Sequence, residues 1–230
     1  IETSKSNCPA TYSRVISTLL PNQTSALTPL LPSLALIPTV TVMVINFYYN
    51  SPTILPVRGF GYLLPKNISY YKNPELGLGV VFDSDVIQGQ DTAPGTKLTV
   101  MMGGHWWNSF VAYPEDGEGI KMAKAMLKRH LGIDKEPDYV RVKLQKECIP
   151  QYNVGHQGIL AKAKDEMRAF NGRLSVTGSG YKGIGVNDCV AAARELVWSI
   201  ASGSNSNMTT GLEWVDEDLK QVLVRDILDL

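Results

Sequence analysis

A glycine-rich turn between a short strand-like run and an apolar helical run constrains this sequence more than any other segment. Residues 173–177 (RLSVT) have β-forming composition, residues 190–200 have helical spacing, and residues 178–185 (GSGYKGIG) contain four glycines. Because glycine has no Cβ, backbone N–H groups in such a turn can approach a flat or anionic ligand closely. The first turn of the following helix adds unpaired N–H donors and a partial positive charge. The pattern therefore predicts backbone that can receive an anion or a polarised ring.

The pattern alone also fits an ordinary glycine-rich connection between a strand and a helix, since short motifs of this kind are weakly specific. Asn187 and Asp188 follow the turn and have side chains typical of residues that cap a helix start. A flavin would suit the site, because the pyrimidine edge of a reduced flavin is anionic and a helix N-terminus aimed at it stabilises the reduced form.

Charge and cysteine content exclude several other functions. The 230 residues carry 22 basic and 22 acidic side chains, so no net field favours nucleic acid or an anionic membrane. Cys8, Cys148 and Cys189 are far apart and lack the spacing of a disulfide framework or a zinc site. We therefore expect no metal centre, and we expect a reducing compartment.

The start of the chain and its most apolar stretch bear on targeting. The chain begins with Ile1 and lacks the pattern of a signal peptide, so we expect a fragment. Residues 30–47 are apolar but contain Pro32 and Pro38, which argues against a helix that spans a membrane.

Periodicity predicts an α/β (α+β) chain with a mixed or antiparallel sheet. Strands are expected at 40–49, 57–64, 77–82, 97–102, 139–144 and 173–177. Helices are expected at 12–20, 118–131, 159–170, 190–200 and 215–230. The composition of residues 202–207 (SGSNSN) is that of a linker.

Five ordered blocks carry a resemblance to a known family. They are LPVRGFGYLLP at 55–65, GVVFDS at 79–84, LTVMMGGH at 98–105, CIPQY at 148–152 with Gly155 and His156, and YKGIGVNDC at 181–189. Together they resemble the protoporphyrinogen oxidases of the flavin amine oxidase superfamily, and five blocks in order are far more specific than any one of them. The resemblance implies the C-terminal part of an FAD-linked amine-oxidase-like fold.

The resemblance also implies ligands and site residues. The family uses FAD to oxidise protoporphyrinogen IX to protoporphyrin IX, with oxygen as the acceptor. Flavin contacts are implied at Ile184, Gly185, Val186 and Asn187, and walls of a tetrapyrrole pocket are implied at Phe60, Gly61, Leu63 and Met101. No catalytic side chain is implied. Apolar residues in β-prone runs are more often core than pocket, so the resemblance alone supports the tetrapyrrole positions.

Organisation and partners complete these expectations. The resemblance implies a substrate-binding region at 1–170, the return of the FAD-binding domain at 171–201, and a linker with a terminal helix at 202–230. The chain has no GxGxxG turn followed by the acidic residue that contacts the ribose of FAD, and its nearest glycine pattern, at 178–183, lies at the wrong end of the chain. We therefore expect roughly the last two-fifths of an enzyme, inactive alone. By resemblance, the whole enzyme is a homodimer on the mitochondrial inner membrane.

Two alternatives remain open. The first is a flavin amine oxidase or carotenoid desaturase relative with another substrate, because the strand, turn and helix would serve any of them. The second is an inactive truncated chain, whose sheet edge and last helix only mediate association.

Overall fold

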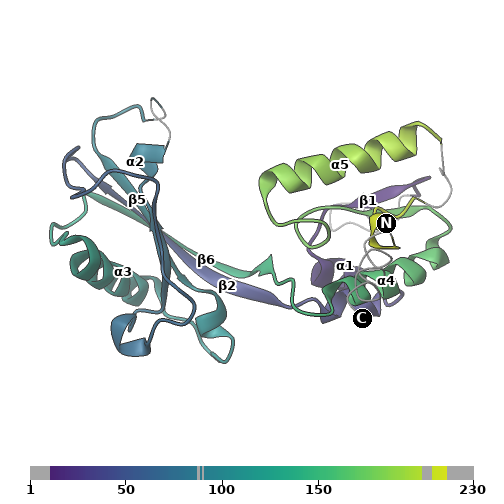
Figure 1. The fold of residues 1–230 in the computed structure, drawn as a ribbon, viewed down its shortest axis with the longest axis horizontal. Coiled ribbons are helices and arrows are strands. Elements are labelled where there is room, and N and C mark those ends of the chain that lie inside the picture. Colours follow the sequence, from purple (N-terminus) through teal and green to yellow (C-terminus); the bar gives the residue numbers. More distant parts are fainter. Residues whose placement is uncertain (1–10, 87–88, 90, 204–208, 217–230) are drawn as a thin grey trace, which may run out of the picture. The chain divides into compact units, whose positions relative to one another are not determined.

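The computed structural model describes residues 11–86, 89, 91–203 and 209–216. It divides the chain into two compact units, residues 40–148 and residues 1–39 together with 149–230 (Figure 1). The functional division at 170 and 201 that the resemblance implies stays a prediction. The segment before residue 40 and the helix before residue 171 lie with the glycine turn, because the chain returns to this unit after its excursion through the sheet. The two units are therefore described separately.

The unit of residues 40–148 is built on a five-stranded sheet with the order β3-β4-β5-β2-β6. The neighbours β3–β4, β4–β5 and β5–β2 are antiparallel. One helix, α3, packs along this sheet (Figure 1). The elements are β2 (Thr39–Tyr49), β3 (Gly61–Leu63), β4 (Gly77–Val81), α2 (Asp83–Val86), β5 (Thr96–Gly103), α3 (Asp116–Leu131) and β6 (Tyr139–Pro150).

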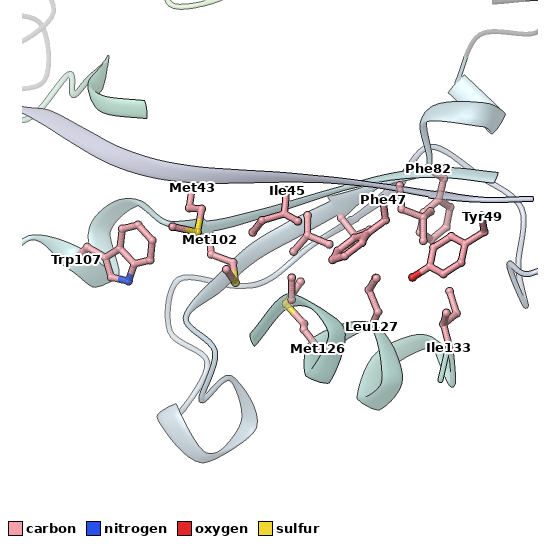
Figure 2. Close-up of a cluster of buried hydrophobic side chains, with 14 residues drawn as sticks. Met43, Ile45, Phe47, Tyr49, Phe82, Met102, Trp107, Met126, Leu127 and Ile133 are labelled. Atoms are coloured by element: carbon pink, nitrogen blue, oxygen red, sulfur yellow. The ribbon is translucent and has the colours of Figure 1, made fainter. Parts of the chain in front are cut away.

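The core of this unit lies between the sheet and α3. Alternate side chains of β2, among them Met43, Ile45 and Phe47, point toward Met126 and Leu127 of α3 (Figure 2). A period of two on the strand and an apolar stripe on the helix produce this contact. Gly132 ends α3 in the left-handed conformation, as its position after the apolar stripe predicts.

The sheet prediction is confirmed, with one strand shorter and one longer than expected. The run at 57–64 contributes only β3, because Gly59, just before the strand, and Gly61, its first residue, both have positive φ. A Cβ on Gly61 would lie 2.1 Å from the carbonyl oxygen of Val80, so only glycine fits this close strand approach. In contrast, β6 continues to Pro150, well beyond the predicted end at residue 144.

Among its described residues, the second unit contains a two-stranded parallel sheet and the helices α1, α4 and α5. Its elements are β1 (Val15–Ser17), α1 (Pro21–Leu27), α4 (His156–Glu166), β7 (Leu174–Val176) and α5 (Val186–Ala201), and β1 pairs in parallel with β7. Its core joins the helix α4 to β7 and to the chain at 31–37 and 212–215. The described residues contain no helix long and apolar enough to cross a membrane.

The predicted helix at 12–20 is wrong. Val15 and Ile16 form β1, because these β-branched residues find a pairing partner in β7. Pro21, the residue after this predicted helix, is the first residue of α1. Proline favours this position because the N–H it lacks would have no partner there. Of the helix predicted at 215–230, residues 215 and 216 are described and are helical, and residues 217–230 lie outside the described residues.

Candidate functional site

The glycine turn begins after β7 and ends at α5, as the sequence predicts. The helix α5 begins at Val186, earlier than the expected residue 190, and Gly185 is its N-cap. Asn187 and Asp188 therefore lie inside the first turn rather than at the cap. Within the described chain no side chain caps this N-terminus, but the Asp188 carboxylate accepts a hydrogen bond from the Gly185 N–H at 3.2 Å. The first-turn N–H groups of α5 remain available to a ligand.

The predicted flavin-contacting residues lie together and face outward. Ile184 is 46% exposed and Val186 is 79% exposed, and they lie on either side of Gly185. Apolar side chains beside free N–H donors at a helix start are what a flat ring with a polar edge requires. The contact of these residues with a flavin, which the resemblance implies, stays a prediction.

Glycine is required at several points of the turn. A Cβ on Gly183 would lie 2.5 Å from the Cβ of Asp188, and a Cβ on Gly180 would lie 2.2 Å from Pro21 Cδ. Gly178 has a φ of 119°, which L side chains rarely adopt. The turn therefore packs tightly against α1 and against the first turn of α5.

Residues 152 and 156 hold the turn in a way that the sequence analysis did not foresee. The Tyr152 hydroxyl donates a hydrogen bond to the Ser179 carbonyl oxygen at 2.8 Å and accepts one from the Gly183 N–H at 2.9 Å. Its ring stacks on His156. Both residues belong to a sequence block that carried the family resemblance. Membership in that block was the available sequence signal for a role beside the turn.

Three of the four predicted tetrapyrrole positions lie on one face of the five-stranded sheet. Leu63 of β3 pairs directly with Gly79 of β4, and Gly79 pairs directly with Met101 of β5. Directly paired residues point to the same face of a sheet, so Leu63 and Met101 share one face. Gly61 shares this face because Leu63 lies two residues further along β3. The core residues Val80, Val100 and Met102 point to the other face, toward α3.

Phe60 precedes β3, outside the strand, and 71% of its side chain is exposed. Its carbonyl oxygen accepts a hydrogen bond from the Phe82 N–H at 3.0 Å, which ties the residue to the end of β4. Met101 is half-buried, whereas Leu63 is exposed. The face that these positions share is thus apolar and open in this unit.

Two other features of the chain, the Cys148 thiol and a surface cleft, do not form a reactive site. Burial raises the pKa of the Cys148 thiol, so this cysteine is less reactive than usual. A cleft of about 990 Å³ lies beside β1 and α1, and its lining includes Tyr12, Ile16 and Leu27 but no residue of the glycine turn. Neither feature contributes to the predicted flavin or tetrapyrrole positions.

Comparison with solved structures defines the class of fold. Similar structures are a protein of Exiguobacterium sp. 255-15 provisionally named as a protoporphyrinogen oxidase (TM-score 0.68, 23% identity, 81% of this chain and 40% of that chain), a reduced UDP-galactopyranose mutase (0.67, 12%, 89% and 44%) and a putrescine oxidase variant (0.54, 14%, 84% and 43%). The chain has a mixed α/β fold that matches part of these flavin amine oxidase-like structures.

Comparison with curated sequences narrows this class. The chain is 38% identical to the protoporphyrinogen oxidase of Schizosaccharomyces pombe over 173 residues and 34% identical to that of Homo sapiens over 195 residues. These alignments cover 74% and 81% of the chain, but the chain spans only 34% and 38% of the two relatives. No protein-family model matches. The chain is thus a homologue of the protoporphyrinogen oxidases over part of their length.

Proposed function

We propose that this chain supplies the part of an oxygen-dependent protoporphyrinogen oxidase that contacts the flavin ring and walls the substrate. The reaction is the FAD-dependent oxidation of protoporphyrinogen IX to protoporphyrin IX in heme biosynthesis. The identity to curated protoporphyrinogen oxidases carries this proposal. The uncapped start of α5 and the apolar sheet face around Leu63 and Met101 support it.

The glycine turn fits a flavin on the features of its own residues. The outward side chains of Ile184 and Val186 offer apolar contact to a ring, and the first-turn N–H groups of α5 offer donors to its polar edge. Bound FAD would supply the electron acceptor for the substrate. The chain itself would orient the ring and stabilise negative charge at its pyrimidine edge.

The apolar sheet face fits the macrocycle in the same way. Leu63 and Met101 lie on either side of Gly79 on this face, and the side chain of Leu63 is 78% exposed, so it offers apolar contact to a flat ligand. Burying apolar surface contributes about 25 cal/mol per Å², less the costs of binding. This face would therefore bind the tetrapyrrole by shape and hydrophobic contact rather than by charge.

By the same resemblance, we propose that the whole enzyme is a homodimer at the mitochondrial inner membrane, with its membrane contact outside this chain. The chain itself would be inactive, because it lacks the glycine motif that holds the ADP part of FAD.

A chimera tests the proposal. The chain replaces the homologous segment of the Schizosaccharomyces pombe protoporphyrinogen oxidase, and the product is assayed for porphyrin fluorescence and for oxygen consumption. We expect flavin retention and oxidation of protoporphyrinogen IX. A folded chimera that retains flavin but oxidises amines and not porphyrinogens would instead support an amine oxidase relative.

A second substrate is favoured by one comparison. The chain is 27% identical over 82 residues to the coproporphyrinogen III oxidase of Bacillus subtilis. Coproporphyrinogen III carries more carboxylates than protoporphyrinogen IX, and an apolar face disfavours buried unpaired charge. Assaying the chimera with both substrates at equal concentration decides between them, and we expect a preference for protoporphyrinogen IX.

A further inference from the structure

Tyr152 lies between the end of β6 at Pro150 and the start of α4 at His156, yet its hydroxyl reaches across the glycine turn. It is 2.8 Å from the Ser179 carbonyl oxygen and 2.9 Å from the Gly183 nitrogen. These two atoms lie four residues apart, on opposite arms of the turn. One side chain from outside the turn therefore fixes the separation of its arms.

The chemistry of the phenol allows both contacts at once. A tyrosine hydroxyl has one proton to donate and lone pairs to accept with, so it donates to Ser179 and accepts from Gly183. Burial raises the pKa of Tyr152 to about 12, so the hydroxyl keeps its proton at neutral pH. Both hydrogen bonds are then present under physiological conditions.

The ring of Tyr152 is itself held in place. It stacks on His156 with ring centroids 4.0 Å apart and an interplanar angle of 14°. His156 is 7% exposed and belongs to α4, which is part of the core of this unit. The hydroxyl is therefore carried on a support that packing has already ordered.

Gly183 links this support to the start of α5. Its N–H is held by Tyr152, and its carbonyl oxygen lies 3.7 Å from the Cys189 thiol, which donates to it. A Cβ on Gly183 would contact Asp188, the residue that accepts from the Gly185 N–H. A shift of Gly183 therefore moves the first turn of α5.

We propose that the Tyr152 hydroxyl is a positioning group that holds the glycine turn, and through it the first-turn N–H groups of α5, in the geometry that meets the flavin ring. This inference rests on the proposed flavin role of the turn. Tyr152 itself does not need to touch the cofactor, and its effect reaches the ligand through Gly183 and the helix start.

Tyr152→Phe in the full 230-residue chain tests the proposal, because it keeps the stacked ring and removes only the hydroxyl. Backbone NMR follows the hydrogen exchange of the Gly183 amide and the chemical shifts of residues 186–188. We expect Gly183 to exchange about tenfold faster, as for the loss of one hydrogen bond, with shifts that extend into residues 186–188. Tyr71→Phe is the matched control, since Tyr71 is 78% exposed, and it should leave these signals unchanged.

Two outcomes overturn the proposal. If Gly183 exchange is the same in Tyr152→Phe, the hydroxyl does not hold the turn. If Gly183 changes while the amides of residues 186–188 do not shift, the effect stops short of the helix and the positioning role fails. A role of the ring in packing alone would move neither signal.

The unmodified chain provides a measurement that does not depend on how the variant folds. Its Gly183 amide should be protected from exchange, and exchange at the rate of an unstructured peptide would refute the contact. The chimera assay separates this inference from the proposed function. A chimera without flavin alongside the expected Gly183 result refutes the flavin role and leaves the contact between Tyr152 and the turn intact.

Discussion

Leu63 and Met101 lie on either side of Gly79 on one face of the five-stranded sheet. The family resemblance implies Leu63 and Met101 as tetrapyrrole contacts, although they are 38 positions apart in the chain. Strand register brings them onto one face, and the strands approach so closely at Gly79 that no side chain fits there. Glycine at this position is therefore a structural requirement of the proposed substrate face.

Adding a side chain at Gly79 should destabilise the unit of residues 40–148. In Gly79→Ala the new Cβ would lie 2.4 Å from the Tyr62 carbonyl oxygen, a backbone atom that cannot move aside cheaply. We expect a loss of about 1–3 kcal/mol in the free energy of unfolding, as for overpacked sites. Urea unfolding, monitored by the amide hydrogen exchange of β4 and β5, measures this loss.

The control for this substitution is Gly117→Ala in α3, where a Cβ would meet no atom within 4 Å. Alanine is favoured over glycine within a helix by up to about 1 kcal/mol, so the control should be neutral or stabilising. Equal effects of the two substitutions would show that Gly79 has no special packing role.

Acid should destabilise the unit that holds the glycine turn through His156. Burial lowers the pKa of His156 below its usual 6.5, so the unfolded chain binds a proton at a higher pH than the folded chain does. Stability that depends on a neutral His156 is therefore present above pH 6.5 and is lost as pH falls through and below that value. We expect a lower urea midpoint for β7 amide signals at pH 5.5 than at pH 7.5.

His156→Phe should remove much of this pH dependence, because phenylalanine can stack on Tyr152 and does not titrate. The other two histidines, His105 and His130, belong to residues 40–148, so His130→Gln is the control that should leave the β7 signals unaffected. An unchanged slope in His156→Phe would assign the acid sensitivity to another group.

The chain by itself should bind FAD weakly or not at all and should show no oxidase turnover. In the proposed role its glycine turn would meet only the ring end of a flavin, and the sequence contains no GxGxxG turn followed by the acidic residue that contacts the ribose at the ADP end. Titration with FAD, followed by quenching of flavin fluorescence, measures the affinity. Tight one-to-one binding would contradict the proposal that the site is only partly present.

The sequence predicted the parts of the fold in which local pattern and tertiary contact agree. The helix α3 and the strands β2, β4 and β5 have a clear period, and each also buries the face that its period indicates. The glycine turn was predicted for the same reason, since Gly180, Gly183 and Gly185 meet close contacts and Gly178 has a positive φ that larger residues rarely adopt.

The errors arose where a distant partner overrides local pattern. Val15 and Ile16 have helix-compatible spacing, but pairing with β7, more than 150 residues away, makes them a strand. The role of Tyr152 is likewise invisible to periodicity, because it depends on where Ser179 and Gly183 lie in space. Membership in a sequence block similar to the family was the only indication of it.

The central claim is that the backbone around Gly185 contacts the flavin ring, and Gly185→Trp in the chimera with the Schizosaccharomyces pombe enzyme tests it most directly. The measurement is flavin retained per polypeptide after purification, with Gly158→Trp as the control because a Cβ at Gly158 meets no atom within 4 Å. The account predicts that Gly185→Trp loses flavin and porphyrinogen oxidation while Gly158→Trp keeps both. Unchanged flavin content and turnover in a folded Gly185→Trp chimera would contradict it.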